Sequence, residues 1–453
     1  MLNFNHDDFI APISKFEAML KTNEVLFFDA QEFESIVQYY IDYGKLNLAG
    51  RALEIGMNQH PGNGELLLLK SEILIFEGNF KKSLEIIEIA EQLIPQHEEI
   101  FLQKATIASK SKQHSEAIKF LNKALDLCED PLEIWSLIGM EFIILEDFNS
   151  AKYYFKLCLE EDPLDYQSLY NLLHTFDQLD DSSGAIETLN LILEKDPYCE
   201  VAWHQLGKIY CNLQKYTEAI SAFEFAIISD DKFTGAYIEI GRILEKTGKL
   251  NMAIENYHIA LQINDPSAFV FHRIASCYKA LGSNDLSIQF YKKAVNTEPT
   301  FEKGWIAIID FYYLNNDFTN ALVFAKRALE SNGDNSIITY KLGQTFFKLE
   351  QFSDAAFYYE SAIQLGDCNK EIWNNLLDCL IKLYRFNQAK NKINKALEIY
   401  PNSPEIVFRL AIVEIKTGNI ELAKKHLNSI NRSSINELFK NDLYNNLRNM
   451  IKQ

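Results

Sequence analysis

The chain has 453 residues, of which 47% are hydrophobic and 24% charged, a composition typical of a folded protein and not of a disordered one. Its formal net charge of −19, from 63 acidic and 44 basic residues, disfavours nucleic acid and anionic membrane surfaces as partners. The N-terminus does not read as a signal peptide, no apolar run approaches a membrane span, and the seven cysteines include no Cys-x-x-Cys pair, so we expect a cytoplasmic protein.

The first 29 residues are expected to form an N-terminal capping segment, with a short helix from about Pro12 to Lys21. The stretch from Asp29 to Glu32 then has the pattern of a helix capping box. The main array is therefore predicted to begin at residue 30.

A small residue recurs every 34 residues along the rest of the chain. It is alanine or serine at all twelve positions: Ala49, Ser83, Ala117, Ala151, Ala185, Ala219, Ala253, Ser287, Ala321, Ala355, Ala389 and Ala423. Four residues after each of these comes a bulky residue, with Ala325 as the exception. Spacings of three, four and seven between apolar residues mark one face of a helix, so each unit is predicted to be two antiparallel helices joined by a tight turn.

The unit 200–233 carries the most complete pattern: Trp203, Leu206, Gly207, Tyr210, Ala219, Phe223 and Ala226. This order resembles the signature of the tetratricopeptide-repeat (TPR) family, in particular bacterial-type proteins with many tandem repeats. The resemblance implies an all-α fold, a right-handed α-α superhelical solenoid of about twelve 34-residue hairpins with N- and C-terminal capping helices. The expected repeats are 30–63, 64–97, 98–131, 132–165, 166–199, 200–233, 234–267, 268–301, 302–335, 336–369, 370–403 and 404–437, and the segment 438–453 is expected to be a solvating helix.

Some repeats depart from the pattern. Val37, Leu173, Ile309 and Leu377 replace the small residue of the first helix, so these hairpins should be splayed or differently angled. The repeat 302–335 combines Ala325 with Gly333 in place of proline, and we expect it to be the weakest seam of the array.

Catalytic and metal-binding patterns are missing from the sequence. No zinc-protease, nucleophile-elbow, dinucleotide or phosphate-loop motif occurs, so the chain is predicted to be no enzyme and to bind no cofactor. His174, His204 and Asp177 could together approach a metal ion, but no cysteine cluster or supporting motif accompanies them, and we expect no metal site.

The family resemblance implies that first helices line the concave surface, through the second, fifth, ninth, twelfth and thirteenth residues of each repeat. In the middle repeats these positions hold aromatic and basic residues, the candidate binding groove: Tyr170, His174, His204, Lys208, Arg242, Lys246, Phe269, His272 and Lys279. In the first four repeats they are mainly apolar, including Ile41, Leu68, Ile75 and Phe76, beside an acidic edge of Glu65, Glu99 and Glu133. The last repeats mix Asp310, Tyr313, Lys348, Asp378, Phe408 and Lys416 with further polar residues.

The leading hypothesis is a non-catalytic scaffold or adaptor that binds protein or peptide segments in this groove, with an acidic part of the partner at the basic middle. A regulatory or substrate-recruiting subunit of a separate enzyme is the alternative. An RNA-binding helical repeat is less favoured, because the chain is acidic and the period is constant.

Overall fold

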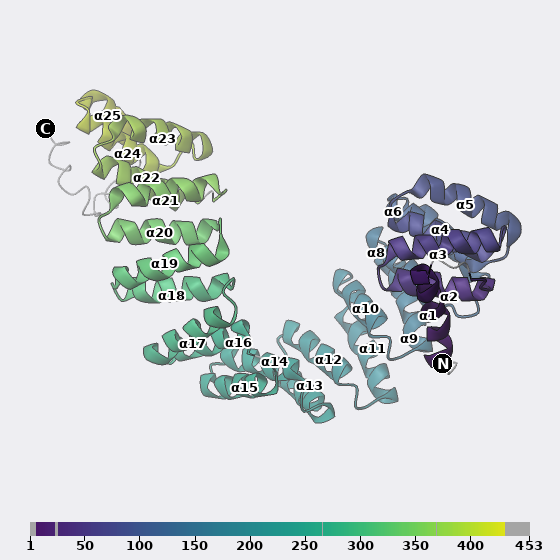
Figure 1. Ribbon diagram of the computed structural model, residues 1–453. Helices are drawn as coiled ribbons and strands as arrows, with labels where there is room; N and C mark the ends of the chain where they lie inside the picture. Colours follow the sequence, from purple (N-terminus) through teal and green to yellow (C-terminus); the bar gives the residue numbers. More distant parts are fainter. Residues whose placement is uncertain (1–5, 23–25, 265, 368, 431–453) are drawn as a thin grey trace. The chain divides into compact units, whose positions relative to one another are not determined.

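The computed structural model describes residues 6–22, 26–264, 266–367 and 369–430, with side chains from residue 11 onward. Helices make up all of the regular secondary structure in these ranges, and they contain no strand. The chain divides into two compact units, Met1–Pro197 and Tyr198–Gln453. Each unit is a stack of antiparallel helix hairpins (Figure 1), so the predicted all-α solenoid of hairpins is confirmed. The expected C-terminal helix at 438–453 lies outside the described residues.

The hairpins follow the N-terminal helix α1 (His6–Thr22), and their first helices begin 34 residues apart. These first helices are α2 (Ala30–Asp42), α4 (Gly64–Phe76), α6 (Glu98–Lys110), α8 (Leu132–Ile144), α10 (Tyr166–Gln178), α12 (Glu200–Asn212), α14 (Thr234–Lys246), α16 (Ala268–Ala280), α18 (Glu302–Leu314), α20 (Ser336–Lys348), α22 (Lys370–Lys382) and α24 (Pro404–Lys416). The second helices are α3 (Leu46–Gln59), α5 (Phe80–Leu93), α7 (His114–Leu125), α9 (Phe148–Glu161), α11 (Ser182–Lys195), α13 (Tyr216–Ser229), α15 (Leu250–Ile263), α17 (Asn284–Thr297), α19 (Phe318–Asn332), α21 (Phe352–Gln364), α23 (Phe386–Ile399) and α25 (Ile420–Asn428).

The recurring alanines and serines lie inside the hairpins. All twelve are buried, and none is more than 3% exposed. The small residue of the first helix also lies in close contact with the second helix. A Cβ atom on Gly207 would lie 2.6 Å from the Phe223 ring, and one on Gly241 would lie 2.5 Å from the Tyr257 ring. Small residues in one helix therefore make room for an aromatic ring from the other, which fixes the close approach of the pair.

Hairpins without that small residue are more open. Val37, Leu173, Ile309 and Leu377 lie in α2, α10, α18 and α22, whose second helices approach them less closely than in the other hairpins of full length. The prediction of splayed hairpins is thus confirmed. The widest separation is between α10 and α11.

The prediction that 302–335 is the weakest seam is wrong as far as packing goes, because α10 and α11 contact each other less than α18 and α19 do. Ile309 of α18 and Ala325 of α19 are both fully buried, and they occupy the positions that Gly207 and Phe223 occupy in α12 and α13. The large and the small residue have exchanged helices, so Ile309 supplies much of the volume that Ala325 lacks. Gly333, with φ of 64°, ends α19 in place of a proline.

Every hairpin turns through a left-handed residue at the same place in the repeat. Five of these residues are glycines, such as Gly248, while seven carry side chains, such as Lys112 and Gln214, with φ between 52° and 61°. The turn geometry is thus constant although the sequence at the turn is not.

The N-terminal end is closed by α1. Ile13, Phe16 and Met19 of this helix are buried in one cluster with Phe33 and Tyr40 of α2. The expected capping box is present: Asp29 accepts a hydrogen bond from the backbone of Glu32 (2.8 Å), and the Glu32 carboxylate accepts one from the backbone of Asp29 (2.9 Å). Among the helices described, none has the length and apolar character that crossing a membrane would require.

Candidate functional site

An acidic hollow lies between successive first helices of the N-terminal unit, with a volume of about 480 Å³. We call it the acidic hollow, and its lining comes from α2, α4, α6 and the residue that caps α6: Glu34, Ser35, Gln38, Glu65, Leu68, Leu69, Glu72, His97, Glu98, Glu99 and Gln103. Five of these are glutamates, and neither lysine nor arginine is among them. The hollow therefore concentrates negative charge.

The crowding of these glutamates affects their ionisation. Burial, together with the nearby Glu99 and Asp42, raises the pKa of Glu72 to about 7. Burial is also the main cause that raises the pKa of Glu34 and of Glu99, while hydrogen bonds from Asn63 and Gln103, respectively, partly oppose it. A cation entering the hollow would relieve this repulsion.

One histidine at the rim contacts two of the acidic residues. The Nε2 atom of His97 lies 3.1 Å from the Glu65 carboxylate, and its Nδ1 accepts a hydrogen bond from the backbone N–H of Glu99 at 3.3 Å. A proton on Nε2 satisfies both contacts.

A second hollow, of about 110 Å³, lies in the C-terminal unit between α12 and α14. We call it the basic hollow, and it brings together three of the predicted groove residues, Lys208, Arg242 and Lys246. Glu239 also lines it and binds Arg242 at 2.7 Å, while Nζ of Lys246 lies 5.9 Å from the centre of the Tyr216 ring. Three cations against one carboxylate leave this hollow net positive.

Two predicted groove histidines are less accessible than the sequence suggested. His204 packs against Phe223 and Phe233, with ring centres 5.5 and 5.1 Å apart, and His272 packs in the same way against Tyr291 and Phe301, at 5.3 and 5.6 Å. Burial is the main cause that lowers the pKa of both rings to about 4, and the neighbouring Lys208 or Arg273 and Lys303 add to it. Both rings are therefore neutral at pH 7.

The remaining predicted residues are exposed and do not line the basic hollow. Tyr170 and His174 belong to α10 of the N-terminal unit. Phe269 and Lys279 are exposed residues of α16 in the C-terminal unit.

Several residues expected on the groove surface are buried. In the first repeats, Ile41, Leu68 and Ile75 are at most 8% exposed, because they fill the space between hairpins. In the last repeats Asp378 and Phe408 are buried, and Asp378 accepts two hydrogen bonds, at 2.6 and 2.7 Å, from Arg409.

The acidic hollow contains residues that the sequence analysis overlooked: Glu34, Glu72, Glu98 and Gln103. A signal for two of them was available, because Glu34 and Glu72 occupy the fifth and the ninth position of their first helices, where groove residues were sought. The sequence analysis recognised the acidic edge at Glu65 and Glu99, but it did not recognise that Glu34 and Glu72 extend this acidic surface across α2 and α4.

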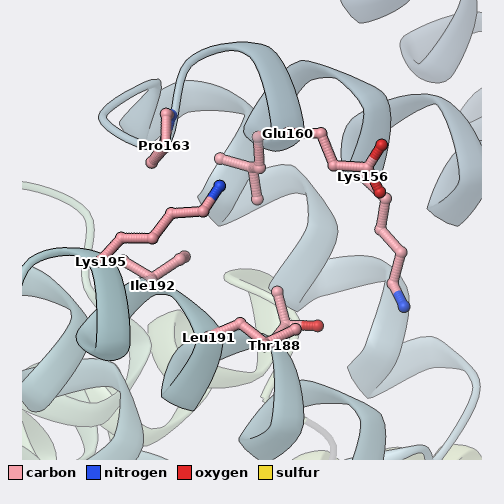
Figure 2. A pocket seen from close by; sticks show the side chains of 8 residues that line it. Lys156, Glu160, Pro163, Thr188, Leu191, Ile192 and Lys195 are labelled. Atoms are coloured by element: carbon pink, nitrogen blue, oxygen red, sulfur yellow. The ribbon is translucent and has the colours of Figure 1, made fainter.

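A third hollow, of about 170 Å³, lies beside the second helices α9 and α11 of the N-terminal unit (Figure 2). Its lining includes the buried Leu159 and Ile192 and the two lysines Lys156 and Lys195. The hollow lies beside α11, which belongs to the most open hairpin, α10–α11.

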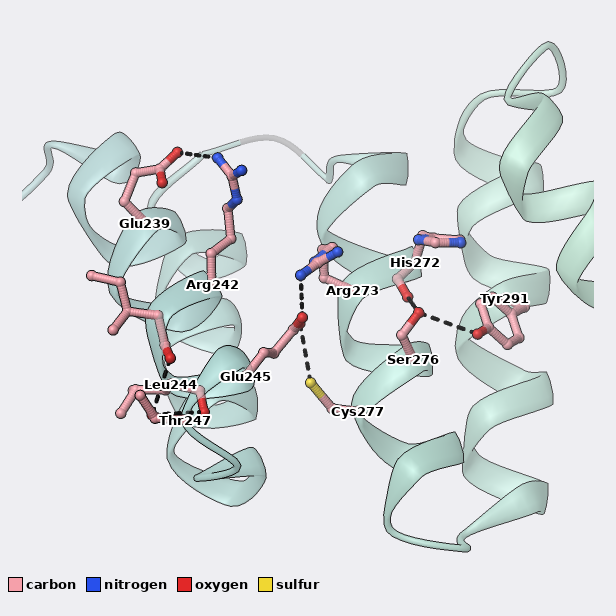
Figure 3. A network of polar contacts seen from close by, with 11 residues as sticks. Glu239, Arg242, Leu244, Glu245, Thr247, His272, Arg273, Ser276, Cys277 and Tyr291 are labelled. Atoms are coloured by element: carbon pink, nitrogen blue, oxygen red, sulfur yellow. Dashed lines mark hydrogen bonds and ion pairs between the residues drawn. The ribbon is translucent and has the colours of Figure 1, made fainter. Parts of the chain in front are cut away.

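A polar network ties α14 to α16 in the C-terminal unit (Figure 3). Glu245 forms an ion pair with Arg273 and accepts a hydrogen bond from the Cys277 thiol at 3.2 Å. Burial, followed by the contact with Glu245, raises the pKa of Cys277 to about 12, so this thiol is protonated and unreactive. The network is an inter-repeat contact rather than a reactive centre.

In the ranges that the structure covers, no group of three or more histidine, cysteine, aspartate or glutamate side chains is arranged to hold a metal ion. The site that the described residues do offer is a pair of charged surfaces, one acidic and one basic, each built from successive first helices.

Comparisons with known proteins agree with the repeat pattern. Two family models described as tetratricopeptide repeat match the chain, one at residues 98–131, 132–163, 201–227, 234–265 and 270–301, the other at residues 380–434. These matches lie in both units.

Among solved structures, the chain is similar to the C-terminal part of a TPR repeat-containing protein from Cytophaga hutchinsonii, at 20% identity over 52% of this chain and 96% of that one, with a TM-score of 0.45. It is also similar to a tetratricopeptide repeat protein from Parabacteroides merdae, at 16% identity over 54% and 97% of the two chains, with a TM-score of 0.37. YrrB, described as a TPR protein with an unusual peptide-binding site, matches at 14% identity over 42% and 97%, with a TM-score of 0.34. From the matched repeats and the 34-residue recurrence of buried helix hairpins, we conclude that the chain belongs to the tetratricopeptide-repeat family, as a protein of about twelve repeats.

Proposed function

We propose that the protein is a non-catalytic interaction scaffold, which binds an extended segment of a partner protein on the face formed by its first helices. In the C-terminal unit the basic hollow contacts an acidic part of that segment. The observation that carries this proposal is the convergence of Lys208, Arg242 and Lys246 from two successive repeats on one hollow.

The chemistry of the hollow favours a carboxylate-bearing segment. Arg242 and Lys208 are exposed, so both can exchange solvent contacts for contacts with a ligand at little cost in desolvation. Glu239 already holds Arg242 in place, which lowers the entropy lost when a carboxylate binds. Tyr216 provides an aromatic wall beside Lys246 for the apolar part of a peptide.

The test uses a fluorescein-labelled peptide of alternating glutamate and alanine, titrated with the full chain at low salt. The double variant Lys208→Glu/Arg242→Glu should weaken binding by about tenfold or more, because both cations become anions. Its melting temperature should stay within a few degrees of the parent, since neither side chain is part of the core.

A matched control reverses two charges outside the hollow. Lys232 and Lys249 are exposed residues of the same unit that do not line the hollow, and Lys232→Glu/Lys249→Glu changes the net charge equally. Equal loss of binding in both double variants would show that only the overall charge matters, and would reject the basic hollow as the site.

A further inference from the structure

Among the described residues the acidic hollow has one ion pair, between His97 and Glu65 at its rim, and no lysine or arginine lines it. No ion pair or hydrogen bond joins Glu72 to any residue that the structure describes, although Glu72 lies at the centre of the lining helix α4. Its nearest charged influences are Glu99 and Asp42, which repel it. An isolated carboxylate cluster of this kind costs stability, so a counter-charge from a ligand would be favourable.

A buried acceptor in the same hollow also lacks a donor. Gln103 is 4% exposed, and its Nε2 donates to the backbone oxygen of Leu68 and to the Glu99 carboxylate, both at 3.0 Å. These two bonds fix the orientation of the amide, and they leave its Oε1 buried without a hydrogen-bond partner. A buried acceptor that lacks a donor destabilises the fold, so an N–H group entering from the hollow would be stabilised there.

The donor set favours an organic cation over a metal ion. The carboxylates are spread over α2, α4 and α6, and no three of them come close enough to form a metal site in the described residues. Lysine and arginine side chains offer several N–H donors each and can reach separated acceptors. Leu69, a partly exposed residue of the lining, supplies an apolar surface for their alkyl stems.

The extent of the hollow favours a chain segment over a single small cation. It spans the first helices of three successive repeats, and its volume of about 480 Å³ exceeds the 110 Å³ of the basic hollow. Acidic residues lie along its whole length, from Glu34 on α2 to Glu98 on α6. A peptide with more than one positive charge can therefore contact several of them at once.

We propose that the acidic hollow binds a lysine- or arginine-bearing segment of a partner protein, whose cationic groups pair with Glu34, Glu72 and Glu99 and donate to Oε1 of Gln103. This inference rests on the proposed scaffold function, but it assigns a second, separate surface to ligands of the opposite charge. The two surfaces can be tested independently.

The experiment titrates the full chain with a fluorescein-labelled peptide of alternating lysine and alanine. The parent protein should bind it, and the triple variant Glu34→Gln/Glu72→Gln/Glu99→Gln should bind it about tenfold or more weakly. The matched control is Glu54→Gln/Glu85→Gln/Glu88→Gln, which removes three exposed carboxylates from α3 and α5 and the same net charge. The control should bind within about twofold of the parent.

Equal weakening by both triple variants, or no binding by the parent, would overturn the proposal. Should the hollow triple variant fail to fold, Glu72→Gln alone removes one crowded charge, and it should still weaken binding by about threefold. Unchanged binding by a folded Glu72→Gln protein would also count against the proposal.

Two competitors identify the kind of cation. Spermine at the same concentration of positive charge should displace the lysine peptide less effectively than unlabelled peptide does, and magnesium chloride at matched ionic strength should have only the effect of screening. Displacement by spermine or magnesium at concentrations below those of the peptide would overturn the assignment to a protein segment.

The glutamate peptide separates this inference from the proposed function. Its binding depends on the basic hollow, so the triple variant of the acidic hollow should leave its affinity unchanged. Normal binding of the glutamate peptide with no binding of the lysine peptide would reject the further inference alone. The reverse result would reject the basic hollow alone.

Discussion

The acidic and the basic hollow present opposite charges from the same place in the repeat. The ninth residue of the first helix is Glu72 in α4 of the N-terminal unit, whereas it is Lys208 in α12 and Arg242 in α14 of the C-terminal unit. Around Glu72 the neighbours are further glutamates, while Arg242 already has a partner in Glu239. The same backbone thus carries two surfaces whose ligands should have opposite charges. Helix packing constrains the residues at the buried positions, whereas the ninth position of the first helix is free to vary.

The largest expected effect comes from a substitution that disrupts the close packing of α12 against α13, the hairpin that contributes Lys208 to the basic hollow. Gly207→Leu would place side-chain atoms where the Phe223 ring lies, since even a Cβ atom would be 2.6 Å from it. We expect a loss of about 3 kcal/mol in the free energy of unfolding of the C-terminal unit, measured by denaturant titration.

The same variant tests whether the two hollows are independent. Binding of the glutamate peptide should fall because Lys208 is the next residue, while binding of the lysine peptide should persist. Gly50→Leu is the matched control, since a Cβ atom on Gly50 meets nothing within 4 Å. Leucine has the higher helix propensity, so Gly50→Leu should not destabilise the protein, and equal destabilisation by both substitutions would refute the role of packing against Phe223.

A smaller effect is expected from exchanging the charge at the ninth position. Glu72→Lys should weaken binding of the lysine peptide by about tenfold, and Arg242→Glu should do the same for the glutamate peptide, as measured by fluorescence anisotropy. Glu85→Lys and Lys249→Glu, on exposed residues outside both hollows, serve as controls. If either Glu72→Lys or Arg242→Glu changes the affinities for the lysine peptide and the glutamate peptide equally, the two hollows do not bind ligands of opposite charge.

The units should also respond to pH in opposite directions. The pKa of Glu72 is raised to about 7 in the folded chain, so the folded state holds more protons than the unfolded one between about pH 4.5 and 7, and stability near the acidic hollow falls as pH rises. The groups that face Glu72 are Glu34, Asp42, Glu99 and, at the rim, His97. We expect a loss of about 1–2 kcal/mol across this range, after allowing for partial exposure.

In the C-terminal unit the sign is reversed. The pKa values of His204 and His272 are lowered to about 4, so the unfolded state holds more protons between about pH 4 and 6.5, and stability rises with pH in that window. Amide hydrogen exchange of α4, α12 and α16, corrected for intrinsic rates at each pH, measures both trends. A common slope in the two units would contradict the assigned environments.

The smallest effect concerns the turns, where the two units should behave alike. Lys112 and Gln214 have φ of 61° and 59°, which a residue with a side chain adopts at a cost and glycine adopts readily. Lys112→Gly and Gln214→Gly should each raise the free energy of unfolding by about 0.5–1 kcal/mol. Gly248→Ala, at the equivalent position with φ of 77°, should lower it. A loss of stability in both glycine variants would refute this account of the turns.

Much of the fold could be predicted because its rules act within one repeat. The buried alanine series, the openness of the hairpin that carries Leu173 and the capping box at Asp29 each depend on residues close in sequence or one hairpin apart. The mistake at 302–335 came from reading Ala325 without Ile309, whose volume compensates for it.

The site was harder to predict because exposure depends on neighbouring repeats. His204 and His272 occupy groove positions, but Phe233 and Phe301 from the following loops cover them. Leu68 is buried in the same way by adjacent hairpins, so the glutamates beside it determine the character of the surface. Position in the repeat indicates which face a side chain lies on, whereas burial depends on the size of residues at the junction with the next repeat.

The most direct test of two oppositely charged binding surfaces is a hydrogen-exchange footprint of the full chain with each peptide in turn. The lysine peptide should protect amides of α2, α4 and α6 only, and the glutamate peptide should protect those of α12 and α14 only. Protection of the same helices by both peptides, or of helices outside these two sets, would contradict the account.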